Sequence, residues 1–134
     1  MKYTLDTNTC IRAINGRSPR IREQLLAIPA SDIVVCSIVR SELFYGSAKS
    51  QTPMRSRQKQ ALFLAPFESL SFDDSVASVY GEIRATLEKQ GTPIGPLDLQ
   101  IASIAVAHNL ILVTHNTSEF GRINGLELED WEAT

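Results

Sequence analysis

The chain has 134 residues, a length that suits one domain able to bury roughly two thirds of the surface that the unfolded chain exposes. Hydrophobic residues make up 43% of the composition and charged residues 21%, which excludes a disordered polymer. No apolar run approaches the roughly 20 residues of a transmembrane helix, and Lys2 and Asp6 interrupt the start before a signal peptide could develop. We therefore expect one cytoplasmic domain over residues 1–134, without a membrane partner.

The formal net charge of −2 argues against binding a polyanion through bulk charge. However, eight of the 13 Lys and Arg residues lie in two stretches that contain no acidic residue. The first basic stretch holds Arg12, Arg17, Arg20 and Arg22, and the second holds Lys49, Arg55, Arg57 and Lys59. Acidic residues crowd instead near the end of the chain, at Glu127, Glu129, Asp130 and Glu132. Segregated charge permits RNA binding without proving it, because solvated helix faces carry the same pattern.

The hydrophobic pattern switches repeatedly between short strand-like runs and longer helical ones, which predicts an α/β fold. Residues 3–5 are typical of a first strand, and Ser18-Pro19 predicts the start of a helix. Residues 33–36 predict a second strand, after which Ser37 can cap another helix. A helix through the second basic stretch is expected to end before Pro66.

In the second half of the chain, Asp73 or Asp74 is expected to cap the longest helix, and Gly91 to end it. Residues 99–106 predict a nearly all-apolar helix. The remaining strands are predicted at residues 67–72, at residues 110–114 and, as a final edge strand, around Leu126 and Leu128.

Acidic side chains follow these strands at the places where functional groups gather in open parallel sheets. Asp6 comes directly after the first strand, and Glu42 lies in the helix after the second. Asn116 and Glu119 follow the most hydrophobic strand, while Asp98 begins the helix that leads into it. All five side chains are expected at one edge of the sheet.

Taken singly, most of these carboxylates also fit structural roles. Asp6 and Asp98 stand where helix caps are expected, and Glu119 is compatible with an exposed loop. Glu42 is harder to explain in this way, because it lies beside the inward-facing apolar stripe of its predicted helix. A carboxylate left buried and unpaired is costly, and no neighbouring position on that face is basic. The pattern therefore favours a bound cation.

Carboxylates that converge in one crevice repel each other, and such a cluster is stable mainly when it holds a hard divalent cation. Mg²⁺ or Mn²⁺ is the expected ion, since both prefer oxygen ligands. A metal of this kind can activate water and stabilise the charge that develops at a phosphate. Phosphodiester hydrolysis is the predicted chemistry.

Four short motifs, in this order along the chain, resemble those of the PIN-domain ribonucleases and, most closely, of the VapC toxins of bacterial type II toxin–antitoxin pairs. The resemblance continues through Gly125-Leu126 and Glu129-Asp130-Trp131, and so covers essentially the whole chain. The motifs are Leu5-Asp6-Thr7-Asn8, Ser41-Glu42-Leu43, Gly95-Pro96-Leu97-Asp98, and Val113-Thr114-His115-Asn116 followed by Glu119-Phe120.

The resemblance implies a PIN-like three-layer domain in which helices flank a mostly parallel central sheet. It also implies that Asp6, Glu42 and Asp98 are acidic metal ligands. The fourth contribution stays open between Glu119 and Asn116, because many relatives carry aspartate at the latter position. The implied pocket also includes the polar side chains of Asn8 and Thr114.

The partners implied by the resemblance are a VapB-type antitoxin and a structured RNA such as transfer RNA. A homodimer and a toxin–antitoxin hetero-oligomer are expected on the same ground. A small antitoxin could block the acidic crevice with a basic side chain that compensates its carboxylates in place of the metal.

Three other functions compete with this interpretation. Haloacid dehalogenase-like phosphohydrolases also carry an aspartate after the first strand, but they need a second aspartate where this chain has Asn8, and no lysine follows Lys89 to complete such a site. A receiver-type signalling domain lacks the same lysine and the adjacent acidic pair. A catalytically silent PIN-like binding module is disfavoured by the intact carboxylates, and a metal-dependent cleavage assay separates it from an enzyme.

Histidine-based RNA cleavage usually needs a general base and a general acid, and only His108 and His115 are available. His108 is expected at a helix end in a structural role, which leaves His115 without a histidine partner. Cys10 and Cys36 are expected to be buried thiols.

Overall fold

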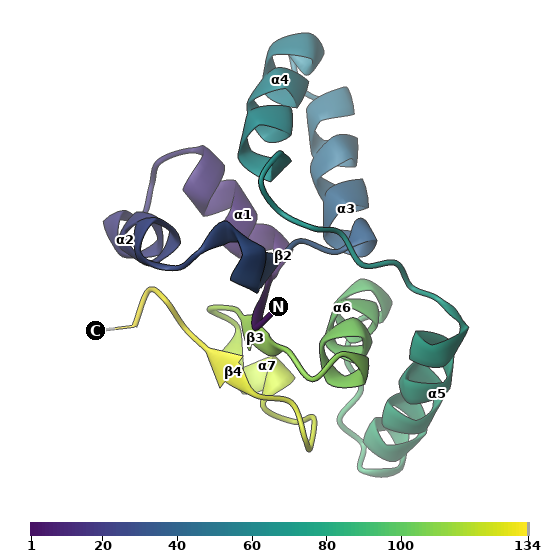
Figure 1. The fold of residues 1–134 in the computed structure, drawn as a ribbon. Coiled ribbons are helices and arrows are strands. Elements are labelled where there is room, and N and C mark those ends of the chain that lie inside the picture. The colour runs from purple at the N-terminus through teal and green to yellow at the C-terminus, as the bar shows by residue number, and fades with distance from the viewer. Residues whose placement is uncertain (134) are drawn as a thin grey trace.

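The computed structural model describes residues 1–133 as a four-stranded sheet with seven α-helices around it (Figure 1). The strands are β1 (Tyr3–Leu5), β2 (Ile33–Val34), β3 (Ile111–Val113) and β4 (Leu128–Glu129). The helices are α1 (Thr7–Ile14), α2 (Pro19–Ala27), α3 (Ser37–Ala48), α4 (Pro53–Leu64), α5 (Asp74–Lys89), α6 (Pro96–Ala107) and α7 (Thr117–Phe120), with a 3₁₀ turn at Ala30–Asp32.

The sheet has the strand order β2-β1-β3-β4, and all of its pairings are parallel. Tyr3 of β1 lies opposite Ile33 on one side and Ile111 on the other. β4 is the edge strand, as expected. Because parallel strands end at the same edge, the segments that follow β1, β2 and β3 emerge on one side of the domain.

Figure 1 shows α1 and α2 on one side of the sheet and α5 and α6 on the other, with the α3–α4 hairpin standing above them. The three-layer α/β expectation is therefore confirmed. The apolar helix α6 packs on α5, α3 and β3, which is why most of its residues are buried. Within residues 1–133, none of the helices combines the length and the apolar character needed to cross a membrane.

Three predicted helix ends are confirmed, two by hydrogen bonds and one by its backbone conformation. The Ser18 hydroxyl accepts a bond of 3.3 Å from the Ile21 N–H at the start of α2. Asp73, rather than Asp74, caps α5 by accepting from the Val76 N–H at 3.1 Å. Gly91 follows α5 with a φ of +72°, a backbone conformation that glycine adopts without strain.

Three strand predictions were wrong or too long. The strand predicted at residues 110–114 is present but spans only Ile111–Val113. Residues 67–72 form no strand, since the segment makes one isolated bridge, between Glu68 and Val34. The segment lies next to the residues that directly follow β2. There the Arg40 guanidinium donates hydrogen bonds to the carbonyls of Val35 and Phe67 at 2.8 and 3.0 Å. The second strand ends at Val34, two residues earlier than predicted, because the chain turns there into α3.

Two cap predictions were also wrong. Ser37 is the first residue of α3, and the cap position belongs to Cys36, whose side chain makes no capping bond. Asp98 lies inside the first turn of α6, because Pro96 starts the helix and Gly95 takes the cap position. The short helices α1 and α7 were not predicted as elements.

Candidate active site

Asp6 leaves the end of β1 and has only 7% of its surface exposed. Its Oδ1 accepts a hydrogen bond of 2.8 Å from the Thr9 N–H, which makes it the cap of α1. The capping interpretation and the active-site interpretation are therefore compatible, since the cap uses one oxygen and holds the carboxylate in a fixed direction. The second oxygen is left for another ligand.

Glu42 lies half-buried on α3, and its Oε1 accepts a hydrogen bond of 2.7 Å from the Thr7 hydroxyl at the start of α1. This contact joins two helices that are 35 residues apart in sequence. Thr7 orients the carboxylate without neutralising it, because a hydroxyl carries no charge. We did not predict this partner from the sequence, although a hydroxyl directly after the Asp6 position was a possible signal.

Asp98 carries the clearest electrostatic signature of the site. Its pKa is raised from 3.8 to about 6, mainly by burial and in addition by the nearby carboxylates of Glu119, Glu42 and Asp6. The four acidic residues come from four separate segments of the chain. They lie close enough together for their charges to oppose the ionisation of Asp98.

These carboxylates share one region without forming a closed ligand set. Within residues 1–133, no three His, Cys, Asp or Glu side chains are already grouped tightly enough to hold a metal ion. The donor chemistry nevertheless fits Mg²⁺ or Mn²⁺, because the cluster offers only hard carboxylate oxygens. The raised pKa of Asp98 marks a repulsion that a divalent cation would relieve.

One open cavity of about 640 Å³ lies beside Asp6, and we call it the Asp6 cavity. Seven of its eight lining residues are polar or charged. They are Asp6, Asn8, Thr9, Ile11, Arg12, His115, Asn116 and Glu132. Asn8 and Asn116 therefore lie beside Asp6, as the resemblance implied. Thr114 does not line this cavity: it is buried, and its hydroxyl accepts a bond of 3.0 Å from the Asn116 N–H.

A second cavity, of about 290 Å³, lies between α1, α3 and α4, and we call it the Glu42 cavity. Glu42 forms part of its wall, and Arg55 and Lys59 of α4 face the same space. Two residues of the second basic stretch therefore line the same cavity as Glu42.

The PIN domain model matches residues 3–126. The chain belongs to the PIN-domain family. It is 41% identical over 131 residues to the tRNA(fMet)-specific endonuclease VapC of Salmonella typhimurium, covering 98% of both chains. It is 42% identical over 133 residues to the ribonuclease VapC2 of Rickettsia felis, covering 98% of this chain and 99% of that relative.

The fold matches solved structures of VapC-type PIN domains as well. The crystal structure of VapBC2 from Rickettsia felis bound to a DNA fragment from its promoter contains a chain that superposes with a TM-score of 0.92 at 41% identity. The match covers 98% of this chain and 99% of that one. This membership disfavours the haloacid dehalogenase and receiver alternatives.

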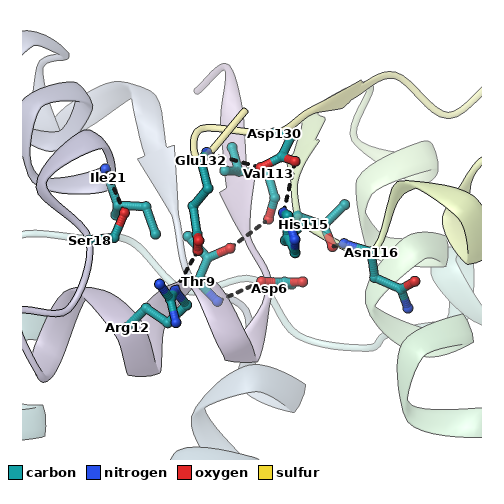
Figure 2. A network of polar contacts seen from close by, with 11 residues as sticks. Asp6, Thr9, Arg12, Ser18, Ile21, Val113, His115, Asn116, Asp130 and Glu132 are labelled. Carbon is teal, nitrogen blue, oxygen red and sulfur yellow. Dashed lines mark hydrogen bonds and ion pairs between the residues drawn. The ribbon is translucent and has the colours of Figure 1, made fainter. Parts of the chain in front are cut away.

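The C-terminal end of this PIN domain contacts one of the two basic stretches, which the sequence alone did not indicate. Residues 129–133, which we call the C-terminal segment, lie against the first basic stretch (Figure 2). Glu132 pairs with Arg12 at 2.6 Å, and the Ala133 carbonyl accepts from Arg20 at 2.7 Å. One ion pair and one hydrogen bond thus join the acidic end of the sequence to the first basic stretch.

Of the two histidines and two cysteines, only His115 lies beside the Asp6 cavity. His108 caps the end of α6, as expected. His115 is exposed and pairs through Nδ1 with Asp130 at 2.9 Å, beside the Asp6 cavity. Burial raises the pKa of Cys10 and of Cys36, which keeps both thiols protonated and unreactive.

Proposed function

We propose that this VapC-type ribonuclease is a toxin that cleaves RNA internally with Mg²⁺ or Mn²⁺ held by Asp6, Glu42, Asp98 and Glu119. The observation that carries the proposal is that the carboxylates of Asp6, Glu42 and Glu119, from three other segments of the chain, lie near enough to half-buried Asp98 to raise its pKa, in addition to the effect of burial. When bound, the cation would supply positive charge that activates water and stabilises the charge developing at the phosphate.

The chain's own residues prepare this point for a cation and for RNA. The Thr7 hydroxyl and the Thr9 N–H fix one oxygen each of Glu42 and Asp6, so the remaining oxygens face the site at little cost in side-chain entropy. Without a cation the cluster would repel a phosphate, and Asp98 would be partly protonated near neutral pH. Cation binding is therefore expected to release protons.

For the fourth position we propose Glu119 as a ligand and Asn116 as a neutral neighbour. Glu119 is the first carboxylate among the charges that raise the pKa of Asp98. Asn116 is exposed and lines the Asp6 cavity instead. Its amide can orient water or a substrate oxygen there.

As substrate we propose a structured RNA, with transfer RNA as the first class to test, because the similar Salmonella typhimurium protein is a tRNA(fMet)-specific endonuclease. As partner we propose a VapB-type antitoxin, because the similar Rickettsia felis chain was solved within VapBC2. We also propose a homodimer and a toxin–antitoxin hetero-oligomer, as the motif resemblance implies. Purification from the native operon should therefore yield a complex, and recovery of a free, uninhibited monomer would contradict this partner.

Product analysis tests the reaction. Hydrolysis by activated water leaves a 5′-phosphate and a 3′-hydroxyl, and it should stop when EDTA is added. His108→Ala and His115→Ala should each leave measurable cleavage, since neither histidine has a catalytic partner. A 2′,3′-cyclic phosphate product, or full activity in excess EDTA, would overturn the mechanism. No cleavage of any RNA under metal-replete conditions would favour the catalytically silent binding module.

A further inference from the structure

Arg12 lines the Asp6 cavity, and the proposed reaction does not use its positive charge. Arg12 of α1 and Asp6, the cap of the same helix, both face this cavity. A ligand that fills the cavity therefore meets a carboxylate of the acidic cluster and a guanidinium together. The polar and charged side chains among its lining residues can bind a charged ligand.

Several arginines of the domain hold the backbone through their guanidinium donors, and Arg12 is not one of them. Arg40 donates to the carbonyls of Val35 and Phe67, and Arg20 donates to the carbonyl of Ala133. Both therefore use guanidinium donors to hold the backbone. Within residues 1–133, Arg12 donates no hydrogen bond to any carbonyl.

The contact between Arg12 and Glu132 fixes one edge of the guanidinium. Arg12 Nε lies 2.6 Å from Glu132 Oε1, but its N–H does not point at that oxygen, so Nε is a buried donor without a hydrogen-bond partner in the described part of the chain. The side chain of Arg12 as a whole is 43% exposed. The opposite edge, formed by Nη1 and Nη2, is left for a ligand, and a guanidinium edge of this kind binds phosphate oxygens in pairs.

The C-terminal segment keeps this arrangement in place. Trp131 packs edge-on against Tyr3 of β1, with the ring centres 5.5 Å apart, and Asp130 pairs with His115. Figure 2 shows Glu132 reaching from this segment to Arg12, on the side of Asp6 away from Asn116. These contacts therefore hold Arg12 at the rim of the Asp6 cavity and leave its Nη1 and Nη2 groups available to a ligand.

From this geometry, and resting on the proposed RNA cleavage, we propose that the Asp6 cavity binds a phosphate next to the scissile one in the RNA backbone, with Arg12 as its binding residue. RNA carries a phosphate at every nucleotide, so a strand whose scissile phosphate lies at the acidic cluster must place a neighbouring phosphate to one side. Arg12 supplies positive charge there without approaching the scissile bond.

The test measures RNA binding rather than cleavage. Proteins carrying Asp98→Asn, which prevents turnover, are titrated with a single-stranded RNA oligonucleotide of mixed sequence at several salt concentrations. Adding Arg12→Ala should weaken binding about tenfold and reduce the slope of log K against log salt by about 0.7, the value for one lost phosphate contact on a single strand. Arg12→Lys should keep most of the slope, because it keeps the charge.

Arg20→Ala is the matched control, because Arg20 also contacts the C-terminal segment but does not line the Asp6 cavity. It should leave the salt slope unchanged. If Arg12→Ala does not fold, Arg12→Gln replaces it, since glutamine retains a donor toward Glu132. An unchanged slope in a folded Arg12 variant, while the parent protein binds RNA, would overturn the subsite alone. Absence of RNA binding by the parent protein would instead overturn the proposed function and the subsite together.

Discussion

The Glu42 cavity and the Asp6 cavity are each lined by one carboxylate of the acidic cluster, but the basic side chains that line them differ in their ion pairs. Arg55 and Lys59 face the Glu42 cavity and form no ion pair with any residue between 1 and 133. Arg12 faces the Asp6 cavity and is paired with Glu132. The difference teaches that the position of a basic stretch in the sequence says little about its electrostatic role, because the fold decides which cations meet an anion.

The largest expected effect lies at the cluster that both cavities share. Asp98→Asn should reduce RNA cleavage at least about a hundredfold, because it removes a ligand and a charge from the proposed cation site. Binding of RNA should persist, since Arg12, Arg55 and Lys59 are unchanged in this variant. Cleavage rate and RNA affinity are measured on the same preparation, and a folded variant with wild-type cleavage would remove Asp98 from the site.

The second prediction tests the Glu42 side of the comparison. The double variant Arg55→Ala, Lys59→Ala should weaken RNA binding about tenfold and lower the salt slope by about 1.4, twice the change for one contact. The matched control is Arg84→Ala, on α5, because Arg84 pairs with Glu88 and lines neither cavity. Equal salt slopes of RNA binding for the double variant and the control would mean that RNA does not bind at the Glu42 cavity.

The third prediction concerns the hydroxyl that orients Glu42. Thr7→Val removes the donor at nearly constant volume and should lower kcat about tenfold, because partners of metal ligands commonly affect activity on this scale. Thr7→Ser should restore most of the rate, and the thermal stability of both variants should stay close to wild type. A Thr7→Ser variant as slow as Thr7→Val would show that the methyl group, and not the hydroxyl, matters.

The fourth prediction follows from the sign of the pKa shift at Asp98. The folded chain raises the pKa of Asp98 from 3.8 to about 6, so folding favours the protonated form. Below about pH 4 the carboxyl is protonated in both states and costs nothing. Between about pH 4 and pH 6 the unfolded chain loses the proton first, so the native state loses stability, and the full cost is present above about pH 6.

Asp98→Asn removes this cost. At pH 7 without metal the variant should therefore be more stable than wild type by about 1 kcal/mol, a figure reduced because Asp98 is only half-buried. The gain corresponds to a rise in Tm of about 3 °C. Thermal unfolding at several pH values checks the trend, and a gain that persists undiminished below pH 4 would point to a different cause.

The smallest effect is expected at the C-terminal segment. Glu132→Gln keeps an oxygen beside Arg12 but removes a negative charge that competes with phosphate, so RNA binding should tighten two- to threefold. The same change should be absent when Arg12 is already alanine. Additive effects of the two substitutions would indicate that Glu132 acts independently of Arg12.

Much of the fold was predictable because local signals were strong. Ser18-Pro19, Asp73 and Gly91 marked helix ends through chemistry that acts within a few residues. The failures arose where several residues compete for one role. Pro96 starts α6 before Asp98 can cap it, and residues 67–72 look like a strand but make only one bridge to the sheet.

The sequence predicted that the carboxylates of the acidic cluster lie near one another, but it did not predict the contacts that orient them. Glu42 stood out because a carboxylate beside an apolar stripe needs a partner, and that argument holds at the level of one helix. Its actual partner, Thr7, and the pairing of Arg12 with Glu132 join segments far apart in the sequence. No local pattern encodes such pairs, and they became visible only once the helices were placed around the sheet.

The central claim is that the acidic cluster is one cation site and that this site cleaves RNA. The most direct measurement titrates Mn²⁺ into the metal-free protein at pH 7, following bound Mn²⁺ by electron paramagnetic resonance and RNA cleavage in the same samples. Cleavage should rise in proportion to Mn²⁺ occupancy, and Asp98→Asn and Glu119→Gln should each weaken both together. Full cleavage at zero occupancy, or unchanged Mn²⁺ binding in both variants, would contradict the account.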